Sequence, residues 1–143
     1  MGEAAPEDLL RTLLDDAAVI DVLAAAGVSA DELRVAVERR CLARLEGVDE
    51  EVLRGRRVDV VALLQALNAG SSTLVGLPLP ARAALGRAVE ESAALRAGRV
   101  RAEHLLVALV AGPDPVVAPA AADVGLRAAV VRRVVARRGR RAT

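Results

Sequence analysis

The residues best placed to do chemistry are Glu103 and His104, a carboxylate beside the only histidine of the chain. Such a pair can exchange protons or hold a ligand. A single histidine cannot build a multi-histidine metal site, however, and no serine or cysteine next to it offers a nucleophile. We therefore expect no catalytic residues and no metal site, and we interpret His104 as a structural, hydrogen-bonding histidine.

This pair belongs to a four-residue motif that the chain carries twice. Glu103-His104-Leu105-Leu106 is echoed by Glu7-Asp8-Leu9-Leu10, at an offset of 96 residues. Later landmarks match at an offset of 98 residues, namely Gly27 with Gly125, Arg34 with Arg132, and Arg39-Arg40 with Arg137-Arg138. A correspondence at a nearly fixed offset is typical of a duplicated unit. Within each copy we expect the leucines in the core and the glutamate at a helix N-terminus, where the helix dipole favours an acid.

The composition limits what such a unit can be. The chain of 143 residues has 54% hydrophobic residues but no Phe, Tyr or Trp, so its core must consist of Leu, Val and Ala. It therefore has no aromatic side chain on which a base could stack. No apolar run approaches the roughly 20 residues of a membrane-spanning helix, and the start is acidic rather than basic as in a signal peptide. These features predict one cytoplasmic domain without membrane contact.

Charge and cysteine content add two further expectations. Residues 1–51 hold 13 acids and 5 arginines, whereas residues 52–143 hold 6 acids and 15 arginines, an asymmetry that could orient self-association. Cys41 is the only cysteine, so no intrachain disulfide forms. We interpret Cys41 as a small core residue; the alternative is a reactive thiol, if Arg40 and Arg44 make its surroundings electropositive.

Helical spacing of apolar residues and the absence of alternating patterns predict an all-α fold. The first unit covers residues 6–46 in three helices. The second helix directs Val19, Ile20 and Leu23 inward. A capping box at Ser29 and Glu32 begins the third helix, which ends at Gly47. Acidic pairs such as Asp15-Asp16, and the run Asp49-Glu50-Glu51 in a short turn at 49–54, are interpreted as solvated caps. Residues 47–79 form a linker with a helix at about 59–68 that Asp59 caps.

Four helices are predicted for the second unit, residues 80–138. The long first helix runs from Pro80 to about residue 97, buries Val89, and is broken by Gly98. The Glu103 helix follows. Residues 116–124 are expected to be an imperfect helix because Pro119 lacks an amide hydrogen. A last helix covers about 127–138, and residues 139–143 form a disordered basic tail.

The second unit resembles the second repeat of the Clp ATPase N-terminal domain, also called the Clp R domain. The shared features are a proline-led long helix, the Glu103-His104-Leu105-Leu106 helix, a short helix that ends at Gly125-Leu126, and a last helix. Residues 6–46 resemble the later three helices of the first repeat. The resemblance implies a compact bundle of two pseudo-repeats in which the first helix of repeat one is missing. We hypothesise that the linker helix fills the vacated groove.

In the Clp family this domain docks substrates and adaptors, and in some members it binds phosphorylated arginine. The motif glutamate and a threonine at the start of each repeat's first helix form that site. The resemblance thus implies Glu103 and Glu7 as ligand-binding residues, with His104, Leu105, Leu106, Leu9 and Leu10 as structural parts of the motif. Pro78 or Leu79 stands where the second threonine would be, which leaves half of a phosphoarginine site. The chain has no lysine, so a nucleotide-binding phosphate loop is excluded.

The sequence therefore predicts a non-enzymatic protein-binding module that needs no cofactor. It would bind peptides, adaptors or Clp proteolysis components through the surface between the repeats. The alternative is a small arginine-rich helical protein that binds nucleic acid or another polyanion through residues 127–143. Nucleic acid is the less favoured partner because the chain lacks aromatic residues. Deleting residues 137–143 would abolish a salt-dependent polyanion interaction and leave a groove ligand bound.

Overall fold

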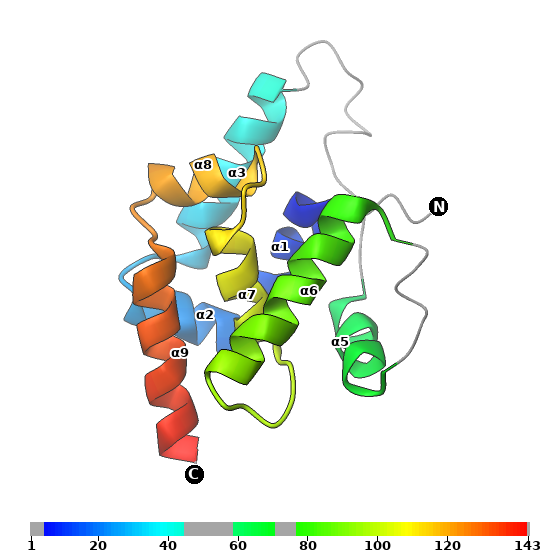
Figure 1. The fold of residues 1–143 in the computed structure, drawn as a ribbon. Helices are drawn as coiled ribbons and strands as arrows, with labels where there is room; N and C mark the ends of the chain where they lie inside the picture. The colour runs from blue at the N-terminus through cyan, green and yellow to red at the C-terminus, as the bar shows by residue number, and fades with distance from the viewer. Residues whose placement is uncertain (1–4, 45–58, 71–76, 143) are drawn as a thin grey trace.

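The computed structural model describes residues 5–44, 59–70 and 77–142, and within these ranges every regular element is an α-helix (Figure 1). The all-α prediction is confirmed. The helices are α1 (Pro6–Leu13), α2 (Ala17–Ala25), α3 (Ala30–Arg44), α5 (Val60–Asn68), α6 (Leu79–Ala94), α7 (Ala102–Ala111), α8 (Val117–Asp123) and α9 (Ala128–Ala142). The predicted turn at 49–54 and the predicted helix end at Gly47 lie outside the described residues.

Local capping bonds explain where several helices begin. The Asp16 carboxylate accepts hydrogen bonds from the amides of Ala18 and Val19 at 2.9 and 3.2 Å, which starts α2. Ser29 Oγ accepts from the Glu32 amide at 3.0 Å at the start of α3, and Asp59 does the same for Ala62 at the start of α5. Each bond satisfies an amide that has no partner within its helix.

The ends of α2 and α8 share one geometry. Gly27 and Gly125 follow these helices with φ of +85° and +71°, a conformation that L-residues with a side chain seldom adopt. The next residues, Val28 and Leu126, donate their amides back to Leu23 and Ala121, each at 2.9 Å. Their side chains are buried. These matching stops are what a duplicated three-helix unit would show.

Helix contacts are also reciprocal between the two halves. α3 packs on α8 while α9 packs on α2, and α1 and α7 contact each other. α6 contacts α7 and α1, and α5 contacts α1 and α7. The linker helix α5 thus stays attached to the bundle, as the groove-filling hypothesis requires, but it contacts α1 and α7 alike and buries only Val60.

Helix α7 lies at the centre of the bundle, in contact with α1, α2, α5, α6, α8 and α9. Every residue of α7 from His104 to Val110 is buried. Leu9 and Leu10 are fully buried as well, like Leu105 and Leu106, so the leucines of both motifs lie in one Leu, Val and Ala core. At about 25 cal/mol per Å² of apolar surface, this burial supplies most of the driving force for folding.

Five expectations about the helices prove wrong. Ile20 and Val89 are 41% and 42% exposed, because α2 directs Val22 inward instead and α6 buries a stripe of alanines. α6 ends at Ala94 rather than at about residue 97, with Arg96 in the left-handed region at φ +56°. Pro119 lies in the first turn of α8, where its missing amide hydrogen costs nothing. α9 continues to Ala142, so most of the predicted disordered tail is helical.

Candidate functional site

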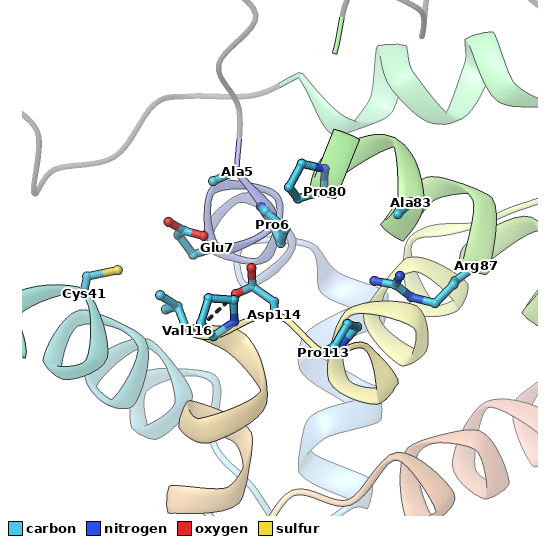
Figure 2. Close-up of a pocket in the computed structure, with 11 residues that line it drawn as sticks. Ala5, Pro6, Glu7, Cys41, Pro80, Ala83, Arg87, Pro113, Asp114 and Val116 are labelled. Atoms are coloured by element: carbon cyan, nitrogen blue, oxygen red, sulfur yellow. Dashed lines mark hydrogen bonds between the residues drawn. The ribbon is translucent and has the colours of Figure 1, made fainter. Parts of the chain in front are cut away.

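A cleft of about 550 Å³ opens where four segments of the two halves meet (Figure 2). Four segments line it: the N-terminus of α1, the C-terminal part of α3, residues 80–87 of α6 and the connection from α7 to α8. The lining residues are Ala5, Pro6, Glu7, Cys41, Pro80, Ala83, Arg87, Pro113, Asp114, Pro115 and Val116. Its volume lies within the range of small-molecule and peptide pockets.

Four prolines give the cleft its apolar walls. Pro6 and Pro80 belong to the first turns of α1 and α6, where proline costs no hydrogen bond. Pro113 and Pro115 belong to the connection between α7 and α8. None of the four has an amide hydrogen, so these residues offer a ligand apolar surface and no backbone donor.

The acidic end of the cleft is formed by Glu7 and Asp114, which lie near each other in Figure 2. Burial raises the pKa of the Glu7 carboxyl, and the negative charges of Asp114 and Asp8 raise it further. Asp114 Oδ2 is already engaged, because it accepts from the amides of Val116 and Val117 at 3.0 and 2.8 Å. Among the described residues, Glu7 has no ion-pair partner.

The basic end is Arg87, in the third turn of α6. Its Nε donates to the Ala108 carbonyl at 3.4 Å, and its guanidinium lies against Gly112. A Cβ added to Gly112 would come within 2.4 Å of Arg87 Nη2. No described carboxylate forms an ion pair with Arg87. Within the described ranges, the cleft therefore has a carboxylate without an ion pair at one end and a guanidinium without an ion pair at the other.

Cys41 lies in the wall of the cleft and is only 3% exposed. Its Sγ accepts a hydrogen bond from Arg11 Nη2 at 3.1 Å, and Arg40 is instead paired with Asp123. Burial raises the pKa of the Cys41 thiol despite the nearby Arg11. The group is thus protonated at neutral pH, which favours the core interpretation over a reactive thiolate.

His104 is buried at the start of α7 and serves the backbone. Its Nδ1 accepts a hydrogen bond from the Arg101 amide at 2.9 Å. Burial lowers the pKa of the imidazole, and the bond at Nδ1 needs the neutral ring. This is the structural hydrogen-bonding role that the sequence predicts.

The two predicted ligand-binding acids do not meet. Glu7 lines the cleft, but Glu103 lies in the first turn of α7, about 14 Å along that helix from the cleft. Sequence reasoning missed Arg87 and Asp114. The extra residues of Gly112-Pro113-Asp114-Pro115 were a signal for Asp114, whereas Arg87 is one of 20 arginines with no local pattern to mark it.

Two kinds of site are not found in the part of the chain that the structure describes. No group of three or more His, Cys, Asp or Glu side chains there is arranged to hold a metal ion. None of the helices in those ranges has the length and apolar character to cross a membrane. Comparison with protein-family models, curated proteins and solved structures found no match to this chain. The resemblance to the Clp domain thus remains an expectation from the sequence.

Proposed function

We propose that this chain is a non-enzymatic peptide-binding module that works through the cleft between its two halves. The observation that carries the proposal is the position of the cleft. α1 and α3 of the first unit form one side, and α6 with the connection from α7 to α8 forms the other. A concave, largely apolar hollow with a few charged groups is the usual form of a ligand site.

The chemistry of the cleft favours a peptide over a reacting substrate. Asp114 is engaged in the cap of α8, burial keeps the Cys41 thiol protonated, and the walls are mostly proline and alanine. An extended peptide segment offers apolar side chains to such walls and charged groups to its two ends.

The resemblance to the Clp ATPase N-terminal domain suggests which peptides these are. We propose segments of substrates, adaptors or components of the Clp proteolysis machinery, bound in the cytoplasm. In that role the chain either competes with a Clp ATPase for shared ligands or links a substrate to it.

A cleft-filling substitution tests the proposal. Ala83 is exposed on α6 and lines the cleft, so Ala83→Trp fills it without disturbing the core. Ala93→Trp, at an exposed position of the same helix outside the cleft, is the matched control. Binding to an array of short overlapping casein peptides should be lost in Ala83→Trp and kept in the control. Equal binding by both variants would refute the cleft as the site.

Helix α9 supports a second candidate function, polyanion binding. Arg132 and Arg138 pair with Glu91 and Asp21, but Arg133 and Arg137 are exposed and have no ion pair among the described residues. An Arg133→Gln, Arg137→Gln variant should lower the slope of log affinity for heparin against log salt by about one per lost phosphate-like contact. An unchanged slope would show that Arg133 and Arg137 of α9 do not bind the polyanion. Neutralising two side chains is preferable to deleting residues 137–143, because residues 137–142 belong to α9 itself.

A further inference from the structure

We propose that the cleft recognises a dipolar peptide segment, in which Arg87 binds a carboxylate and Glu7 binds a basic side chain. This inference rests on the proposed function and adds the class of ligand. It also assigns a specificity-determining role to Arg87.

Arg87 is held in place from one side only. The Ala108 carbonyl accepts a hydrogen bond from Arg87 Nε. Because Gly112 has no side chain, the guanidinium can lie against the backbone there. Its terminal nitrogens are left for another acceptor. A guanidinium presents paired donors that match both oxygens of a carboxylate, so a carboxylate is its best partner.

Among the described residues, Glu7 is the cleft acid whose carboxylate has no ion-pair partner; its hydrogen-bond donor is the amide of its own residue. The nearby cation, Arg11, is already shared by Asp8 at 2.8 Å and Glu38 at 2.7 Å. Asp114 is engaged at the start of α8. A half-buried carboxylate beside a second acid gains most from a cation, because the cation offsets both the burial and the repulsion.

Glu7 and Arg87 form no ion pair with each other, and in Figure 2 their side chains lie apart, with those of Pro6 and Asp114 drawn between them. A ligand with one charge would leave the opposite end unpaired. Glu7 and Asp114 would repel a polyanion, and Arg87 would repel a polycation. A peptide with one acidic and one basic residue, a few positions apart and flanked by small apolar residues, satisfies both ends together.

The test uses four fluorescein-labelled, C-terminally amidated peptides of Ala and Pro. They carry Arg then Glu, Glu then Arg, two Arg, or two Glu at the same positions. For wild-type protein, fluorescence anisotropy should show one dipolar peptide bound at least about tenfold more tightly than either peptide of uniform charge, because each charge-assisted bond contributes about 1.5 kcal/mol or more. Equal affinity for all four would overturn the inference.

Charge reversal at Arg87 provides the second arm. Arg87→Glu should shift the preference to the peptide with two Arg, and Arg87→Gln should remove the contribution of the acidic residue. Arg99→Glu, at an exposed position outside the cleft, should keep the wild-type preference. If Arg87→Gln keeps it too while Ala83→Trp abolishes binding, the cleft binds peptides but the dipolar inference fails. If Ala83→Trp binds like wild type, the proposed function itself fails.

Discussion

Asp8 and His104 make the same capping hydrogen bond at the same position of the two units. Asp8 Oδ2 accepts from the Ala5 amide at 3.0 Å, and His104 Nδ1 accepts from the Arg101 amide at 2.9 Å. Each residue lies in the first helical turn and bonds back to the residue before the helix, which fixes the start of α1 and of α7. Helix capping thus explains the only histidine of the chain. The adjacent glutamates, Glu7 and Glu103, occupy matching positions, but only Glu7 lines the cleft.

The buried imidazole of His104 predicts a loss of stability in mild acid. Its pKa is lowered from 6.5, chiefly by burial and also by Arg101, although Glu103 and Glu91 act in the opposite sense. As pH falls below 6.5 the unfolded chain takes up a proton before the folded protein does, so the free energy of unfolding decreases. His104→Asn keeps an acceptor but does not titrate. Urea unfolding on either side of pH 6.5 should show a smaller decrease for this variant; equal decreases would contradict the prediction.

Glu7 predicts the opposite dependence on pH. Its pKa is raised from 4.5, so the folded protein holds the proton more tightly than the unfolded chain. The stability that this group contributes is present below pH 4.5 and is lost as pH rises through the folded pKa. Glu7→Gln should therefore raise the melting temperature at neutral pH and bind the dipolar peptide more weakly. A lower melting temperature would show that Glu7 makes a stabilising contact.

Arg96 marks a strained helix end. It is the only residue other than glycine with positive φ in the described ranges, and it follows α6 in the position that glycine usually takes. Arg96→Gly should stabilise the protein by about 1 kcal/mol, because the left-handed conformation costs an L-residue roughly this much. Chemical denaturation measures the change. Gly27→Ala, at φ +85°, should have the opposite sign; the same sign for both would contradict the account.

Gly112 is predicted to matter for binding more than for folding. An added Cβ would meet the flexible Arg87 guanidinium at 2.4 Å and the Ala108 carbonyl oxygen at 3.1 Å, so the guanidinium must move far and the backbone only slightly. Gly112→Ala should therefore weaken binding of the dipolar peptide about as much as Arg87→Gln and lower stability by a smaller factor. Gly86→Ala, in the exposed face of α6 with nothing within 4 Å, is the matched control and should stabilise by roughly 0.5–1 kcal/mol. Unchanged binding by Gly112→Ala would show that Arg87 does not contact the ligand.

Features set by near neighbours could be predicted from the sequence. The caps at Asp16, Ser29 and Asp59 and the stops at Gly27 and Gly125 depend on residues within one helical turn. The class of the fold and the leucine core followed from spacing in the same way.

Features set by contacts between distant segments could not. Ile20 and Val89 have the right spacing for burial, but the neighbouring helices do not cover them. The cleft joins Glu7 to Arg87 and Asp114, which lie far away in the chain. No local pattern places these three side chains around one hollow, so the basic half of the site emerged only from the structure.

Amide chemical-shift changes during titration with the preferred dipolar peptide test the central claim most directly. The peptide-binding account predicts that the largest changes fall on the amides of Glu7, Ala83, Arg87, Asp114 and Val116, which line the cleft. The same titration of Ala83→Trp should leave these resonances unchanged. Changes centred on Arg133 and Arg137 of α9, or equal changes in the cleft-filled variant, would contradict it.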